Sequence, residues 1–178
     1  FVNNDSDPVD DNGHGTHVAA IAAGNGVLKG VAPDARLYVY KVLGANGEGD
    51  GGLVAAAIDR ALDPDNNGDL SDRADVINLS LNSATEHNPN DLMSLEVDAA
   101  AQLGAIGVVA VGNNGAGGFI YSPANAREGI AVGAVDKLGN LYSYSTRSKT
   151  SLYIPKPDIV APGVGICAAR AAGQLNGA

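Results

Sequence analysis

Two histidines in a glycine-containing segment are the first residues whose types could do chemistry. The segment reads DDNGHGTHVAA over residues 10–20, with His14 and His17 three positions apart. A zinc pair of the HExxH type has a wider spacing and an intervening glutamate, whereas Gly15 and Thr16 stand between these two histidines. The pattern therefore argues against zinc. It leaves open a histidine on a glycine-lined helix start with room for a substrate, or two structural histidines.

A second candidate is Asn113, which follows an apolar run in the segment VAVGNN at residues 109–114. A side-chain amide of this kind can donate a hydrogen bond to a developing oxyanion. The Gly-Asn-Asn-Gly sequence also suits a turn with left-handed backbone conformations. Residue types alone favour the turn.

The acidic segment DPDNNGDLSD at residues 63–72 resembles a calcium-binding loop. Oxygen-bearing residues occupy the first, third and fifth positions of an EF-hand pattern and Gly68 the sixth, but Ala74 stands where the bidentate glutamate is expected. A solvated acidic turn is the alternative. Because crowded carboxylates repel one another without a cation, the segment predicts a structural calcium site. Its predicted ligands are Asp63, Asp65, Asn67, Asp69 and Asp72.

The segment GEGDGG at residues 47–52 matches the glycine spacing of a dinucleotide-binding fingerprint. Residues 44–46 separate it from the preceding predicted strand, although a phosphate-binding turn should follow the strand directly. Glu48 and Asp50 would also repel a pyrophosphate. Both features argue against nucleotide binding.

Strands and helices alternate along the chain and must position these residues. Apolar runs predict strands at 36–42, 76–81, 106–111, 130–134 and 158–161, and the run at 76–81 is expected to be buried. Periodic patterns predict helices at 53–62, at 91–103 before Gly104, and from about His14, with Val18, Ala19, Ile21 and Ala22 packing inward. This alternation predicts right-handed crossovers and a parallel sheet. With no repeat or flexible linker, residues 1–178 are expected to form a single domain.

Composition excludes several classes of partner. The net charge of −9 argues against nucleic acid and anionic membranes and favours cations. No run approaches the roughly 18 apolar residues of a membrane span. The single cysteine, Cys167, is predicted to be a buried thiol.

The motif NGHGTHVA at residues 12–19 resembles the histidine motif of the subtilisin-like serine proteases, the subtilases. Later blocks resemble landmarks of that family in the same order: GVAP at 30–33, KVLG at 41–44, VINLSL at 76–81, VGNN at 111–114 and VAPG at 160–163. The resemblance implies a three-layer helix, parallel sheet, helix α/β core and a serine endopeptidase acting on polypeptides. It also implies that His14 is the general base, that His17 is structural and that Asn113 donates to the oxyanion.

The resemblance also implies a substrate cleft in which two backbone edges bind an extended peptide by main-chain hydrogen bonds. The residues it assigns to substrate binding are Gly47, Gly49, Ser80, Leu81, Asn82, Val111 and Gly112. Asn82 stands where the family usually has glycine. Its side chain is expected to lean toward the first specificity pocket, which argues against a deep pocket for a large aromatic residue.

The chain contains neither the family's strand-borne aspartate upstream of the histidine motif nor its Gly-Thr-Ser-Met-Ala block. We therefore expect an incomplete protease core that is inactive by itself. The resemblance further implies an extracellular enzyme, with a propeptide or inhibitor as a possible additional partner. The alternative is a non-catalytic module of subtilase type that binds peptide and calcium only.

Overall fold

The computed structural model describes residues 1–172, which divide into two compact units. Among the described residues, the first comprises residues 1–57 and 167–172, and the second comprises residues 58–166. The single domain expected from the sequence stays a prediction.

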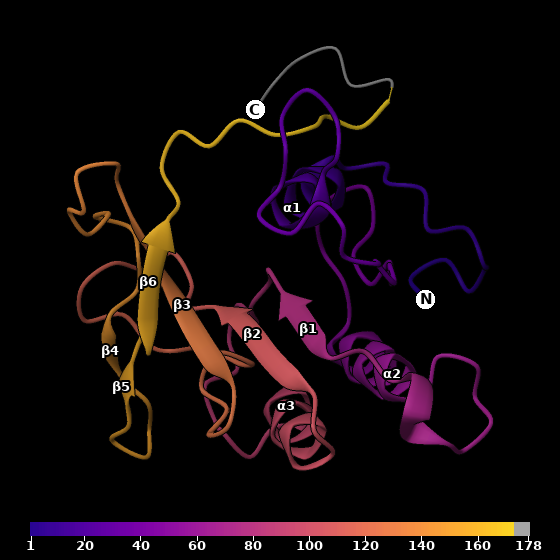
Figure 1. The fold of residues 1–178 in the computed structure, drawn as a ribbon. Helices are drawn as coiled ribbons and strands as arrows, with labels where there is room; N and C mark the ends of the chain where they lie inside the picture. Colours follow the sequence, from indigo (N-terminus) through magenta and orange to yellow (C-terminus); the bar gives the residue numbers. More distant parts are fainter. Residues whose placement is uncertain (173–178) are drawn as a thin grey trace. The chain divides into compact units, whose positions relative to one another are not determined.

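The second unit contains a parallel sheet of four strands in the order β1-β2-β3-β6 (Figure 1). The strands are β1 (Val76–Leu79), β2 (Ile106–Ala110), β3 (Ile130–Val135) and β6 (Ile159–Pro162). Val76 pairs with Ile106, Val108 with Ile130, and Val132 with Ile159. The predicted α/β architecture with a parallel sheet is confirmed. β1 is shorter than predicted, and it is not buried throughout, because only alternate residues, Ile77 and Leu79, face the core.

Helix α3 (Leu92–Gln102) packs against β2. Asp91 caps its start by accepting hydrogen bonds from the N–H groups of Met93 and Ser94 at 3.0 and 3.3 Å. After its end, Gly104 adopts the left-handed φ of 90° that ends many helices. The close packing depends on Gly107 of β2, because a Cβ there would lie 2.8 Å from Val97 Cγ1.

Helix α2 (Gly51–Leu62) begins two residues before the predicted start. The Asp50 side chain accepts a hydrogen bond from Gly52 N at 2.7 Å. Val54, Ile58 and Ala61 on the helix are buried. The acidic segment and a 3₁₀ helix, η1 (Leu70–Asp72), then lead into β1.

In the first unit, helix α1 (His14–Ala23) begins at the predicted residue. The following segment folds back on it, with Val31 N donating to Ile21 O at 3.0 Å. The inward packing predicted for this helix is wrong: Val18, Ala19 and Ala22 are half-buried and Ile21 is exposed. The helix carries mainly small side chains, which cover little surface.

The strand predicted at 36–42 is wrong. The segment is not assigned to any strand, and Leu37, Tyr38 and Val39 are exposed. β-branched and aromatic residues favour an extended backbone, but a strand also needs a hydrogen-bonded neighbour.

Cys167 is exposed, so the predicted buried thiol is also wrong. It lies in an irregular segment that follows β6 in the chain. The remaining strands, β4 (Ser148–Lys149) and β5 (Pro155–Lys156), form an antiparallel pair.

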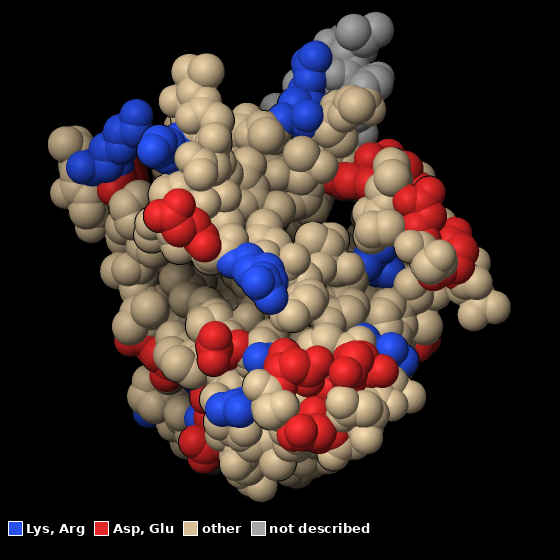
Figure 2. Space-filling model, turned by 45° about the vertical axis from the view of Figure 1, so that its right-hand side comes forward, with Lys and Arg blue, Asp and Glu red and all other residues tan. Residues whose placement is uncertain are grey.

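Acidic side chains gather in groups on the face drawn in Figure 2, with Lys and Arg among them. This matches the net charge of −9. Among the described residues, no helix has both the length and the apolar character needed to cross a membrane.

Candidate active site

His14 is the first residue of α1 and is exposed. Gly13 before it has a φ of 102°, a left-handed conformation that side chains disfavour. A side chain at Gly15, by contrast, would make only ordinary contact with Asp10. The backbone therefore explains one of the two glycines that flank this histidine.

Asp10 fixes the turn that presents His14. Its Oδ1 accepts hydrogen bonds from Asn12 N at 2.9 Å and Gly13 N at 2.7 Å, and its Oδ2 accepts from Thr16 N at 2.8 Å and Thr16 Oγ1 at 2.6 Å. Partial burial opposes the charge, but these hydrogen bonds outweigh it and hold the pKa of Asp10 well below its usual range. Sequence reasoning missed this residue. An acidic residue just before a helix N-terminus was the available signal.

The glycine-rich segment at residues 44–49 lies beside the histidine-containing segment at residues 10–20 within the first unit. Asn12 Nδ2 donates to Ala45 O at 2.9 Å, and a turn is closed by Gly44 N donating to Glu48 O at 2.9 Å. Gly47 has a φ of 77°, and a Cβ at Gly49 would lie 2.2 Å from a backbone oxygen, Val42 O. The local backbone therefore requires glycine at these two positions, which are two of the three glycines assigned to substrate binding.

Asn113 lies in the second unit, in the turn that follows β2. Gly112 before it has a φ of 102°, so a turn is present as the residue types suggested. The Asn113 side chain is exposed, and within residues 1–172 its amide makes no hydrogen bond. It is available to donate to a ligand.

Asn82 connects two of the predicted substrate-binding segments. Its Nδ2 donates to Ala110 O, at the end of β2, at 2.8 Å. Its Oδ1 lies 3.4 Å from where a Cβ of Gly112 would be. The side chain therefore spans from the segment 80–82 to the segment 110–112.

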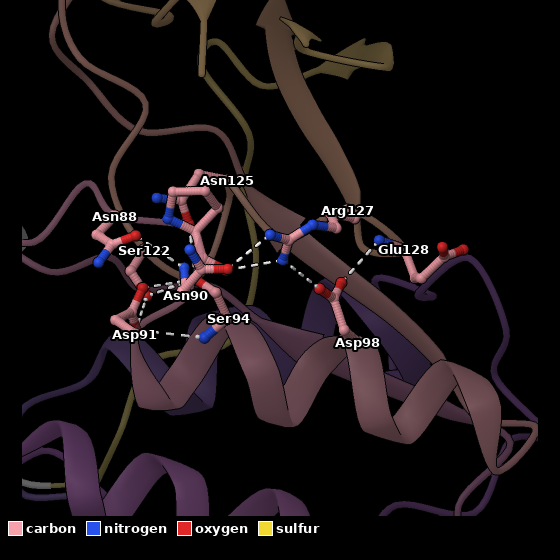
Figure 3. A network of polar contacts seen from close by, with 10 residues as sticks. Asn88, Asn90, Asp91, Ser94, Asp98, Ser122, Asn125, Arg127 and Glu128 are labelled. Atoms are coloured by element: carbon pink, nitrogen blue, oxygen red, sulfur yellow. Dashed lines mark hydrogen bonds and ion pairs between the residues drawn. The ribbon is translucent and has the colours of Figure 1, made fainter. Parts of the chain in front are cut away.

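A buried polar network holds the loop at residues 120–128 against α3 (Figure 3). Ser122 Oγ donates to Asp91 Oδ1 at 2.6 Å, and Ser94 Oγ lies 2.9 Å from Ser122 Oγ. Asp98 of α3 accepts from Arg127 Nη1 at 3.2 Å and from Glu128 N at 2.8 Å. Ser94 and Ser122 are wholly buried, so this serine and aspartate arrangement stabilises the loop and presents no accessible hydroxyl.

The acidic loop brings together part of the predicted calcium site. Oxygen atoms of Asp63, Asp65 and Asp72 lie within 4.8 Å of one another. A hydrogen bond from Gly68 N, the largest contribution, lowers the pKa of Asp63 below its usual value. Asp72 Oδ1 is buried and has no hydrogen-bond partner among the described residues. An unpartnered buried carboxylate oxygen beside two more carboxylates fits a hard cation.

The other two predicted ligands make hydrogen bonds within the same loop. Asn67 Nδ2 donates to Asp65 Oδ2 at 2.9 Å, and its Oδ1 accepts from Asp69 N at 2.6 Å. The Asp69 carboxylate caps η1 by accepting from Ser71 N at 2.9 Å. Among the described residues, the structure therefore groups three of the four aspartates predicted as ligands.

Comparison with known proteins relates the whole chain to one family. It matches the subtilase family, peptidase S8, over residues 1–177. It is 41% identical over 161 residues to the minor extracellular protease Vpr of Bacillus subtilis (strain 168), covering 85% of this chain and 19% of that protein. It is 43% identical over 170 residues to subtilisin Savinase of Lederbergia lenta, covering 93% of this chain and 56% of that protein. The alkaline protease of Alkalihalobacillus alcalophilus is 43% identical over the same length, which is 93% of this chain and 40% of that protein. The chain thus spans 19% to 56% of these relatives.

Proposed function

Because this chain belongs to the subtilase family, we propose that it is part of a serine endopeptidase that hydrolyses polypeptides. In this proposal His14 is the general base, and the Asn113 side chain donates to the oxyanion. The exposed and unbonded amide of Asn113, on a turn of fixed backbone, is the observation that carries the proposal.

The reaction begins when a serine hydroxyl attacks the carbonyl carbon of the peptide bond. His14 takes the hydroxyl proton as the new C–O bond forms, and then gives it to the leaving amine nitrogen. The carbonyl oxygen becomes negative, and the Asn113 amide donates a hydrogen bond to it. Asp10 keeps the backbone before His14 in one conformation through its four hydrogen bonds.

The chain holds no Gly-Thr-Ser-Met-Ala block, so we propose that residues 1–178 alone lack the nucleophile and are inactive. From the family resemblance we propose that the segment 47–49 of the first unit and the segments 80–82 and 111–112 of the second unit each supply backbone groups that bind the substrate peptide. A propeptide or inhibitor with an extended segment would use the same edges. By analogy with the extracellular relative Vpr, we also propose that the protein acts outside the cell.

We propose calcium as a structural ion of the loop at residues 63–72. Asp63, Asp65 and Asp72 would hold it through carboxylate oxygens, consistent with their grouping and with the unpartnered Asp72 Oδ1. The ion would neutralise mutual repulsion at the end of α2. It has no part in the chemical step.

The proposal is tested in the full-length protein with a peptide p-nitroanilide substrate. Asn113→Ala should lower kcat by roughly 10²–10³ with little change in KM, a magnitude established on subtilisin rather than on this chain. A fluorophosphonate probe should not label the isolated 178-residue chain. A full-length protein that binds peptide without hydrolysing it, and that ignores the probe, would instead be the non-catalytic peptide- and calcium-binding module.

A further inference from the structure

One buried residue, Thr146, makes hydrogen bonds on both sides of Asn113. Thr146 N donates to Gly112 O at 3.0 Å, and Asn114 N donates to Thr146 Oγ1 at 2.8 Å. The first bond fixes the peptide group that precedes Asn113, and the second fixes the group that follows it. Thr146 thus holds the peptide planes on both sides of Asn113, and these planes set the direction of the Asn113 Cα–Cβ bond.

Thr146 is itself held firmly. It is 0% exposed. Its neighbour Ser145 accepts a hydrogen bond from Ala134 N of β3 at 3.0 Å. On the other side, Gly115 N donates to Tyr144 O at 2.9 Å, and Arg147 N donates to Gly115 O at 3.2 Å. The segment 144–147 therefore ties the turn after β2 to the neighbouring strand.

The turn is closely packed around the contact between Thr146 and Gly112. A Cβ at Gly112 would lie 3.2 Å from Thr146 Oγ1, so the threonine hydroxyl packs directly against the glycine backbone. The Asn113 amide makes no hydrogen bond of its own within the part of the chain that the structure describes. The backbone consequently sets the direction of the Asn113 Cα–Cβ bond, and Thr146 holds that backbone through its two hydrogen bonds.

We propose that Thr146 is a positioning residue for the oxyanion donor, an inference that rests on the proposed role of Asn113. The amide of Asn113 stabilises the transition state only if it meets the oxygen at hydrogen-bonding distance. Loss of the Thr146 acceptor frees the Asn114 N–H and lets the turn shift. Small displacements of this kind cost up to about 10²-fold in rate.

The test uses four variants of the full-length protein and a peptide p-nitroanilide substrate. Thr146→Val keeps the shape of the side chain but removes the acceptor, and it should lower kcat roughly 10- to 100-fold with KM within about twofold. Thr146→Ser keeps the hydroxyl and should restore most of the rate. Asn113→Ala and the double variant Asn113→Ala/Thr146→Val should have the same kcat, because Thr146 acts through Asn113.

A matched control separates positioning from stability. Ser145→Ala breaks the neighbouring hydrogen bond to β3, so it should lower the melting temperature without a selective loss of kcat. If Thr146→Val does not fold, Thr146→Cys, with its weaker sulfur acceptor, should give a kcat between those of the wild type and Asn113→Ala.

The outcomes distinguish the role of Thr146 from that of Asn113. A normal kcat in Thr146→Val, beside a low kcat in Asn113→Ala, would overturn the role of Thr146 alone. Losses of kcat that multiply in the double variant would also overturn the role of Thr146, because they would show that the two residues act independently. A normal kcat in Asn113→Ala would overturn the oxyanion role and the positioning role together.

Discussion

Asn82 links two segments for which we propose a role in binding the substrate. The family usually has glycine at this position, and the sequence alone suggested that the asparagine leans toward the first specificity pocket. In the structure its amide crosses to Ala110 O at 2.8 Å. If the segments 80–82 and 111–112 both contact the peptide, as proposed, this side chain occupies space between them.

We therefore expect Asn82→Gly to widen the range of substrates in the full-length protein. The ratio of kcat/KM for phenylalanine over alanine, at the residue before the cleaved bond, should rise by about tenfold or more. Ser83→Gly is the matched control, because the Ser83 hydroxyl only accepts local N–H groups from Thr85 and Glu86. An unchanged ratio in Asn82→Gly would show that the asparagine does not border the pocket.

Between helices α2 and α3, two carboxyl groups meet. Burial, then the charge of Asp59 and a hydrogen bond with its carboxyl group, raise the pKa of Glu96 above its usual value. Folding therefore favours the protonated form of Glu96. This stabilisation is present below the ordinary glutamate pKa and is lost as the pH rises through the raised value. Above the raised pKa of Glu96 both groups are ionised and repel each other.

Glu96→Gln should consequently raise the free energy of unfolding at pH 8 by up to about 1 kcal/mol, after allowance for solvent screening. The gain should disappear near pH 4, where the wild-type group is protonated. Urea melts of the fluorophosphonate-inactivated full-length protein at the two pH values measure this. Glu128→Gln, at an exposed carboxylate, is the control, and an equal effect of both substitutions would contradict the pairing.

The acidic loop at residues 63–72 should make the stability of the protein depend on calcium. Calcium that binds only the folded protein stabilises it by about 2.7 kcal/mol at 100 times the Kd, which corresponds to several degrees of melting temperature. EGTA should remove this stabilisation in the wild type, whereas Asp65→Ala should lose most of the dependence on calcium.

Asp136→Ala provides the control for the calcium melts. Asp136 also accepts local hydrogen bonds, from Leu138 N and Asn140 N, but it belongs to no grouped set of carboxylates among the described residues. Asp136→Ala should change the melting temperature by the same amount in calcium and in EGTA. Equal EGTA shifts in the wild type and Asp65→Ala would show that the loop is a solvated acidic turn.

Over the whole molecule, the sequence predicted most accurately the helices and strands that depend on local sequence patterns. Helix α3 has a capping aspartate, an apolar face and a terminal Gly104, and its limits were found to within one residue. The strands of the parallel sheet likewise follow from their apolar runs. The segment 36–42 is also rich in β-branched and aromatic residues, but it forms no strand. Strand formation depends on a hydrogen-bonded neighbour that lies elsewhere in the chain.

The same limit applies to the candidate site. The glycine and histidine motif and the asparagine of VGNN are visible as local patterns. Thr146 is not, because its contact with Asn114 joins residues 32 positions apart and nothing in the sequence around Thr146 indicates it. Four aspartates were predicted as calcium ligands, and the fold groups three of them, whereas the Asp69 carboxylate caps the 3₁₀ helix η1.

The hydrogen bonds around the two proposed catalytic residues also bear on how the protein ages chemically. Asn12-Gly13 precedes His14, and Asn114-Gly115 follows Asn113. Asparagine is among the thermolabile residues, and in such pairs it is lost when the glycine nitrogen attacks the side-chain carbonyl carbon to form a succinimide ring. Here Gly13 N donates to Asp10 Oδ1 at 2.7 Å, and Gly115 N donates to Tyr144 O at 2.9 Å. These hydrogen bonds hold both nitrogens in fixed peptide planes, so we expect the contacts that shape the turns to slow the deamidation of Asn12 and Asn114 as well.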